Sequence, residues 1–248
     1  MTQEELFYSI FENIPRQGPG TKESTLKAFS AIKNLPADAR MLDIGCGKGV
    51  PTFDLAEVFH GTITAIDNHL AFVDFVNRKA KKLGLQNRVA AFVADMNKLP
   101  VGEKQFDVIW SEGSIFITGF ENGLRNWRKI LKDGGYLAVS ETAWFQDDQP
   151  VEIKAFWDRI YPGVMTIPEQ ERLIESCGYQ VVSSFKIPKE GWSVDYYSYL
   201  DKPVKAACEK YHNQPELSGV LDALQHEMEM YKKYGDYYGY VFSVLKKN

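Results

Sequence analysis

The chain has 248 residues, of which 44% are hydrophobic, and a formal net charge of −4. This length and apolar content predict one α/β domain with insertions that buries a sizeable core. The slightly acidic balance provides no broad positive field for phosphate backbones, which counts against a nucleic-acid binder that depends on electrostatics, although a local basic patch remains possible.

The cysteines and the N-terminus indicate where the protein resides. Cys46, Cys177 and Cys208 are too few and too widely spaced for a disulfide framework, which indicates a reducing compartment. The first residues lack the basic start and apolar run of a signal peptide, and no apolar segment reaches membrane-spanning length. We therefore expect a cytoplasmic protein without a membrane span.

The N-terminal residues, MTQEELFYSIFENI, follow a helical pattern with Phe7, Tyr8 and Phe11 on one face. Beyond them, short apolar runs alternate with helix-length segments, which predicts a mostly parallel, doubly wound sheet of the Rossmann-like α/β type. The apolar runs predict strands at Arg40–Gly45, Gly61–Asp67, Arg88–Asp95, Phe106–Ser111 and Gly135–Glu141. The segments between them predict helices at Pro51–Phe59, His69–Leu83 and Glu121–Leu131.

The regular alternation ends after Glu141. The sequence then predicts an aromatic segment at Trp144–Tyr161, a helix at Ile167–Cys177 and a strand at Tyr179–Ile187. A long insertion, Gly191–Tyr234, and a final strand, Gly239–Leu245, follow. We divide the chain into an N-terminal helical lid segment, residues 1–36, and a core domain, residues 37–248. Insertions at 142–166 and 191–234 are expected to pack with the N-terminal helix as a lid over the ends of strands four and five.

A glycine-rich stretch, LDIGCGKGVPTFDLA, follows the first predicted strand and contains Gly45, Gly47 and Gly49. Glycine lets the backbone turn tightly and approach a ligand closely, where the first amides of the next helix are unpaired. A dinucleotide fingerprint that begins at Gly45 requires glycine at position 50, where Val50 stands. Lys48 is followed by glycine instead of the serine or threonine of a phosphate loop. Both phosphate-binding alternatives therefore fit poorly.

The stretch MLDIGCGKG resembles the first motif of the class I S-adenosylmethionine-dependent methyltransferases at every defined position except Met41. Four later stretches are similar to further motifs of that family, so the resemblance covers residues 38–141. They are TAIDNHL, VADMNKLP, FDVIWSEGS and LKDGGYLAVSE. The overall pattern looks like the small-molecule branch that includes the ubiquinone/menaquinone C-methyltransferases and the sarcosine/glycine-type enzymes. The resemblance implies a seven-stranded sheet with an antiparallel last strand, and residues 37–248 as the methyltransferase domain.

The resemblance also implies a set of residues that bind S-adenosylmethionine: Asp43, Gly45, Cys46, Gly47, Gly49, Asp67, Asn68, Asp95, Met96, Ser111 and Glu112. Asp67 stands where the family grips the ribose, and a carboxylate can accept hydrogen bonds from both ribose hydroxyls. Asp95 and Met96 stand where the family addresses the adenine. A carboxylate can accept from the exocyclic amine there, and a thioether can lie against the purine. Asp43 is expected near the amino group of the cofactor.

No metal site is predicted. The histidines, His60, His69, His212 and His226, form no HxxxH pair and lie near no cysteine cluster. Cys46 has no second cysteine at CxxC spacing, so we interpret it as a small residue of the loop.

The methyl acceptor is predicted to be a small, apolar or aromatic metabolite. Aromatic side chains that can line an apolar or cationic pocket are dense where a lid would lie, although such residues more often pack in the core. They are Phe116, Trp144, Phe145, Phe156, Trp157, Tyr161, Trp192, Tyr196, Tyr197 and Tyr199. The segment RQGPGTKEST, residues 16–25, resembles one that folds over the cofactor in some relatives. The amino-nucleic-acid signature is missing after the fourth strand, which disfavours methylation of nucleic-acid bases.

No catalytic residue is assigned. Glu112 and Glu141, at the predicted ends of strands four and five, are candidates for a proton acceptor, and orienting backbone amides is an equal alternative. An S-adenosylmethionine-binding protein without transferase activity and a nicotinamide-dependent oxidoreductase remain as other functions. A homodimer is left open.

Overall fold

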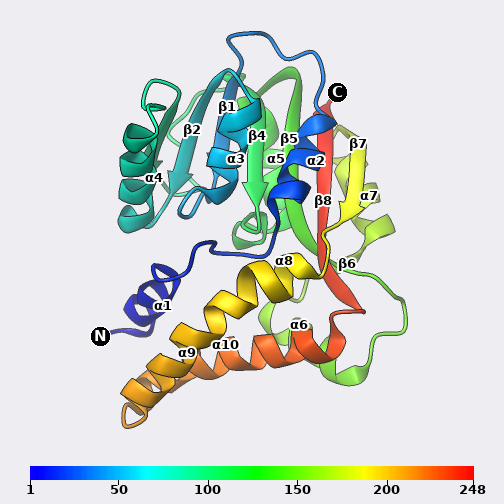
Figure 1. Cartoon of the computed structure of the whole chain (residues 1–248). Coiled ribbons are helices and arrows are strands. Elements are labelled where there is room, and N and C mark those ends of the chain that lie inside the picture. Colours follow the sequence, from blue (N-terminus) through cyan, green and yellow to red (C-terminus); the bar gives the residue numbers. More distant parts are fainter.

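The computed structural model describes all residues, 1–248, and is built around one eight-stranded mixed sheet (Figure 1). Seven strands follow one another in the order β3-β2-β1-β4-β5-β8-β7, and a two-residue strand, β6, pairs with β5 beside this row. The strands are β1 (Arg40–Ile44), β2 (Thr62–Asp67), β3 (Val89–Val93), β4 (Phe106–Glu112), β5 (Leu131–Trp144), β6 (Met165–Thr166), β7 (Tyr179–Lys186) and β8 (Tyr238–Lys247).

The strand directions confirm the predicted mostly parallel sheet with an antiparallel last strand. Strands β1 to β5 pair in parallel, whereas β8 is antiparallel to both of its neighbours, β5 and β7. The expected count of seven strands needs a correction, because β6 adds a short eighth strand against the end of β5. This strand ends at once because Thr166 is also the N-cap of the next helix, where the backbone must turn.

Strand β5 is longer than the sequence pattern indicates. It continues to Trp144 because β8 pairs with it along its length, as far as Trp144 opposite Tyr238. Glu141 therefore lies inside the strand instead of at its end, and the insertion predicted at 142–166 begins within the sheet. The extension depends on a partner about 100 residues away, so no local pattern could indicate it.

Helices cover both faces of the sheet and also its lower end in Figure 1. On one face lie α2, α3 and α4, and on the other lie α5 and α7. The helices and short turns are α1 (Gln3–Phe11), α2 (Lys22–Ser30), α3 (Val50–Val58), α4 (Leu70–Lys82), η1 (Ile115–Ile117), α5 (Phe120–Ile130), α6 (Val151–Ile160), α7 (Ile167–Ser176), α8 (Glu190–Trp192), η2 (Ser193–Tyr197), α9 (Ser198–Tyr211) and α10 (Pro215–Tyr234).

A helical cap, made of α1, α6, α8, η2, α9 and α10, lies beyond the carboxyl ends of the parallel strands (Figure 1). Within it α10 contacts both α9 and α1, and the rings of Phe156 in α6 and His226 in α10 are 5.2 Å apart. Of residues 1–36, only α1 belongs to this cap, because α2 packs on α3 and β8. No helix of the chain combines the length and the apolar character needed to cross a membrane.

Candidate functional site

The glycine-rich loop after β1 adopts a backbone that only glycine takes readily. Gly45, Gly47 and Gly49 have φ angles of +73°, +52° and +73°. A Cβ added at Gly45 would lie 2.5 Å from the Oγ atom of Ser114, so a side chain there would clash with the loop that follows β4. The amide of Gly45 donates to the carbonyl of Ile66 at 2.9 Å, which ties the loop to the end of β2.

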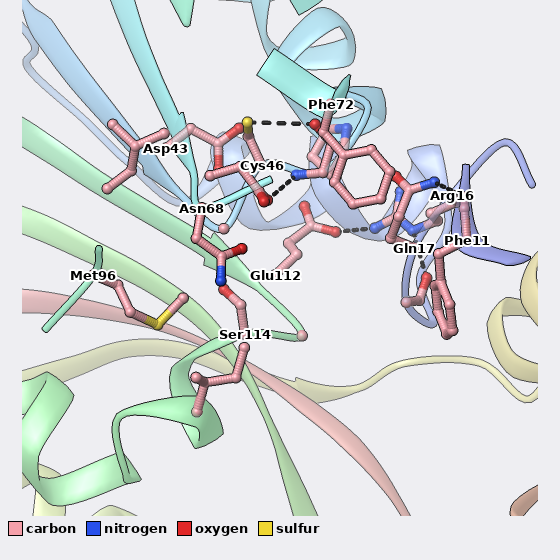
Figure 2. A pocket seen from close by; sticks show the side chains of 18 of the residues that line it. Phe11, Arg16, Gln17, Asp43, Cys46, Asn68, Phe72, Met96, Glu112 and Ser114 are labelled. Carbon is pink, nitrogen blue, oxygen red and sulfur yellow. Dashed lines mark hydrogen bonds and ion pairs between the residues drawn. The ribbon is translucent and has the colours of Figure 1, made fainter. Parts of the chain in front are cut away.

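This loop forms one wall of a cavity of about 350 Å³ at the carboxyl ends of β1, β2, β3 and β4. Figure 2 shows Met96 on one side of the cavity, Phe11, Arg16 and Gln17 on the opposite side, and Asp43 and Cys46 between them. Nine of the eleven residues predicted from sequence line it: Asp43, Gly45, Cys46, Gly47, Asp67, Asn68, Asp95, Met96 and Glu112. The structure therefore brings together residues from the ends of four different strands.

Gly49 and Ser111, the other two predicted residues, do not line the cavity. Gly49 precedes α3 and faces α4, because a Cβ there would come within 2.8 Å of Val76. Ser111 is fully buried, and its hydroxyl lies 2.7 Å from that of Ser114. Gly49 and Ser111 therefore contact neighbouring parts of the protein outside the cavity.

Asp67, the last residue of β2, holds two loops with one carboxylate. Its Oδ2 atom accepts from the Gly47 amide at 2.9 Å, and its Oδ1 atom accepts from the His69 amide at 3.0 Å. Burial raises the pKa of Asp67, and these hydrogen bonds counteract that rise. The next residue, Asn68, accepts a hydrogen bond from the Tyr8 hydroxyl at 3.2 Å. The end of β2 thus contacts both the glycine loop and α1.

Asp95 and Met96 follow β3 on the far side of the cavity from α1. Asp95 is exposed, and its Oδ1 atom accepts from the backbone and side-chain nitrogens of Asn97 at 2.8 and 3.0 Å. These hydrogen bonds hold the pKa of Asp95 below its usual value, so the group remains a charged hydrogen-bond acceptor. Met96 presents a thioether to the same part of the cavity.

Asp43 and Cys46 lie deeper in the cavity wall. Asp43 accepts a hydrogen bond from the Thr52 hydroxyl at 2.5 Å, and burial raises its pKa to about 7. Asp43 can therefore gain or lose a proton near neutral pH. Burial also raises the pKa of the Cys46 thiol well above its usual value, so the thiol is protonated and unreactive. Cys46 serves as a small residue of the loop, in agreement with its interpretation from sequence.

Glu112, at the end of β4, is not a free base. Its carboxylate is paired with Arg16 and also accepts hydrogen bonds from Thr25 at 2.7 Å and from the Trp110 indole at 2.9 Å. Both members of the ion pair are buried. Because its oxygens are already engaged, Glu112 cannot readily take a proton from a substrate, and the candidate role of proton acceptor needs correction.

Residues Glu12–Thr21, the N-terminal strap, connect α1 to α2 and cross over the glycine loop. The Gln17 side chain accepts from the Lys48 amide at 2.8 Å, and Lys48 Nζ donates to the Ile14 carbonyl at 3.0 Å. The sequence prediction of site residues missed Arg16 and Gln17, although the similarity of residues 16–25 to a segment that covers the cofactor pointed to this region. Phe7, Tyr8 and Phe11 of α1 complete this wall, on the helix face that the sequence indicated.

Glu141 does not reach the cavity. Its side chain is 3% exposed, and the Thr142 amide and the Tyr161 hydroxyl lie 2.6 Å and 3.4 Å from its carboxylate oxygens. Burial raises its pKa to about 8. Five of the ten aromatic residues expected in a lid are buried in the core, and of the ten only Phe116 lines the cavity.

A family model described as a methyltransferase domain matches residues 35–235. The chain belongs to this methyltransferase family. The predicted class I, S-adenosylmethionine-dependent methyltransferase is thus confirmed at the level of the family, together with the cofactor that defines it. The more specific likeness to ubiquinone and menaquinone C-methyltransferases stays a prediction, and the nicotinamide alternative gains no support.

Solved structures agree with this methyltransferase fold. An S-adenosylmethionine-dependent methyltransferase from Geobacter sulfurreducens, in complex with S-adenosyl-L-homocysteine, has a TM-score of 0.82 at 22% identity and covers 98% of both chains. The structure of YjhP from E. coli has a TM-score of 0.81 at 23% identity, with 98% of this chain and 100% of that chain covered. At these identities the likeness shows the fold.

Among curated methyltransferases, 27-O-demethylrifamycin SV methyltransferase of Amycolatopsis mediterranei is 32% identical over 108 residues, which are 43% of this chain and 40% of that protein. Sterol 24-C-methyltransferase of Pneumocystis carinii is 24% identical over 170 residues, 65% of this chain and 45% of that protein. The chain therefore spans less than half the length of these relatives.

Proposed function

We propose that this chain transfers a methyl group from S-adenosylmethionine to a small, apolar or aromatic acceptor. The observation that carries the proposal is the cavity itself, which is lined by a glycine loop, by carboxylates at strand ends and by apolar side chains. The apolar side chains include Phe7, Phe11, Phe116 and Ile117. When bound, S-adenosylmethionine supplies an electrophilic methyl group on a sulfonium centre.

The residues of the cavity fit this cofactor. Asp67 would accept hydrogen bonds from the ribose hydroxyls, since two hydrogen bonds to backbone amides leave carboxylate lone pairs free. Asp95 and Met96 would contact the adenine, and Asp43 would face the amino group. Arg16 is the only lysine or arginine among the lining residues, so we assign it the carboxylate of the methionine moiety.

The chain would accelerate transfer mainly by positioning. Correct orientation of two reactants contributes on the order of 7 to 11 kcal/mol in favourable cases, without a dedicated base. Glu112 is held by Arg16 and Glu141 lies outside the cavity, so neither is available to remove a proton. The role of the cap is to exclude water and hold the acceptor against the methyl group.

The acceptor side favours an uncharged molecule. Arg16 and Glu112 neutralise one another, and Phe7, Phe11, Phe116 and Ile117, which are assigned to no group of the cofactor, are apolar. By their names, relatives of this chain methylate a rifamycin and a sterol, which supports an apolar acceptor. Phosphoethanolamine N-methyltransferases are also among the relatives, so charged amines belong in the test.

The test is release of S-adenosylhomocysteine with a panel of quinols, phenols, sterols, carboxylic acids, amines and short RNA and DNA oligomers. Turnover with apolar or aromatic members is expected, and turnover with oligomers alone would contradict the proposal. Thermal shifts with S-adenosylhomocysteine and NADH separate the cofactor classes, because only a specific ligand stabilises the native state. Stabilisation by S-adenosylhomocysteine without any turnover would favour a binding protein that lacks transferase activity.

A further inference from the structure

The ion pair of Arg16 and Glu112 is held in place by donors from the core. Both members line the cavity, and their side chains are only 8% and 3% exposed. The Oε1 atom of Glu112 accepts hydrogen bonds from the Thr25 hydroxyl at 2.7 Å and from the Trp110 indole at 2.9 Å. Thr25, in α2, and Trp110, in β4, are fully buried and lie outside the cavity. Two elements of the fold therefore fix the orientation of one carboxylate.

The two oxygens of the Glu112 carboxylate have separate partners. Oε1 takes both donors from the core, whereas Oε2 pairs with Nη2 of Arg16 (Figure 2). An indole N–H can donate a hydrogen bond but cannot accept one, so an acceptor atom has to remain on the side of Trp110. This requirement keeps Oε2 directed toward Arg16.

The N-terminal strap positions the same guanidinium from its other side. Nε of Arg16 donates to the Gly18 carbonyl at 3.1 Å. Gly20 lies directly against the guanidinium, because a Cβ added there would overlap Nη2. The amide of Gly20 donates to the Gly191 carbonyl at 3.1 Å, which ties this end of the strap to α8. Only a residue without a side chain leaves room for the guanidinium at this place.

One nitrogen of Arg16 is left for a ligand. Nε and Nη2 are engaged within the protein, whereas Nη1 makes no hydrogen bond there. Arg16 is not among the residues whose polar atoms are sealed in the core without a partner, so Nη1 is accessible. Since Arg16 lines the cavity, this nitrogen offers its two N–H groups to a molecule bound there, in the direction that the rest of the guanidinium fixes.

Asp43 indicates which part of the cofactor this nitrogen would meet. Burial is the main cause of the raised pKa of Asp43, but the charge of Glu112 also raises it and that of Arg16 lowers it, so the ion pair lies close enough to act on Asp43. The methionine moiety carries its ammonium and its carboxylate on one carbon, so the protein groups that bind them must be neighbours. Asp43 for the ammonium and Arg16 for the carboxylate meet that requirement.

We propose that Glu112 is a positioning residue, held by Trp110 and Thr25, that directs Nη1 of Arg16 to the carboxylate of the methionine moiety. This inference rests on the proposed methyl transfer and adds the residues that orient the cofactor for it. Hydrogen bonds between a guanidinium and a carboxylate are strong and directional. A fixed guanidinium therefore also fixes the chain that carries the sulfonium, which contributes to the orientation of the methyl group.

The experiment compares S-adenosylhomocysteine with its decarboxylated analogue, which differs only by the missing carboxylate. Calorimetry measures the affinity of both ligands for the wild type and for Glu112→Gln. The Trp110 indole keeps the amide oxygen of the substituted side chain on its own side, so the amide nitrogen faces Nη2 of Arg16 and two donors meet. Arg16 should be displaced, and S-adenosylhomocysteine should bind about tenfold more weakly while the analogue binds as before.

Glu141→Gln is the matched control. It makes the same change at a buried carboxyl group that does not line the cavity, so it should alter neither affinity. Thr25→Val keeps the shape of its side chain but removes one donor to Glu112, and it should also weaken only S-adenosylhomocysteine. Thr25→Ser retains a hydroxyl and should restore the affinity. These Thr25 variants decide the question if Glu112→Gln does not fold.

The outcomes separate this inference from the proposed function. Equal losses for the two ligands in Glu112→Gln, or no loss for either, would overturn the positioning role of Glu112. A wild type that binds both ligands equally well would show that Arg16 does not bind the carboxylate, and the inference would fail with that assignment. Failure of S-adenosylhomocysteine to bind the wild type would instead contradict the proposed methyl transfer.

Discussion

Glu141 provides a test of how a buried carboxylate without a cationic partner affects stability. The side chain is 3% exposed, and its contacts are the Thr142 amide and the Tyr161 hydroxyl. Burial raises its pKa from 4.5 to about 8. Glu141→Gln keeps the shape of the side chain and an acceptor for the Thr142 amide, but the amide cannot ionise.

The sign of the effect follows from proton linkage. Between about pH 4.5 and about pH 8 the native state holds a proton that the unfolded chain releases, so stability falls as the pH rises through this window. Above about pH 8 both states are ionised and the loss levels off. At about 1.4 kcal/mol for each pKa unit, the full shift corresponds to roughly 3 to 5 kcal/mol.

Chemical denaturation of the wild type and Glu141→Gln at about pH 5 and about pH 8.5 measures this difference. The two proteins should have similar free energies of unfolding at the lower pH, and at the higher pH the variant should be more stable by roughly 3 to 5 kcal/mol. Glu103→Gln changes an exposed carboxyl and serves as the control, with no change expected at either pH. A variant whose stability relative to the wild type is the same at both pH values would refute the reasoning.

Three further predictions concern the carboxylates of the cavity. Asp67→Ala should weaken binding of S-adenosylhomocysteine by one to two factors of ten, since contacts to a charged group contribute roughly 1.5 to 3 kcal/mol; an unchanged Kd in calorimetry would contradict the ribose assignment. A cationic ligand group near Asp43, whose pKa is about 7, favours its ionised form, so affinity should rise with pH up to about 7 and level off above it. Asp43→Asn should flatten that dependence in a calorimetric pH series, and parallel curves would argue against contact with the amino group. Glu112→Ala should lower the free energy of unfolding by roughly 3 to 5 kcal/mol, because it leaves the Arg16 guanidinium buried without its carboxylate. The double variant that also carries Arg16→Met should lose less in urea denaturation, and an equal or larger loss would show that the unpaired charge is not the cause.

The parts of the site that sequence could predict are those whose geometry is local. Gly45 and Gly47 must adopt positive φ angles directly after a buried strand, and this requirement selects glycine whatever surrounds the loop. Asp67, Asp95 and Glu112 stand at or just beyond strand ends, and parallel strands bring such ends to one edge of the sheet. The position of a residue at the end of a predicted strand therefore predicts that it lies at the cavity.

Tertiary structure alone decided which carboxylates remain free. Glu112 and Glu141 look alike in sequence, because each stands near the end of an apolar run. In the structure Glu112 is neutralised by Arg16, which lies 96 positions away in the chain. Glu141 is instead enclosed within β5, which is extended by its pairing with β8. Ion pairing and burial depend on which distant segments meet, and no residue pattern within one element records that. For the same reason, the sequence indicates the motifs of a methyltransferase, whereas the strap and cap that shape its acceptor side come from long-range packing.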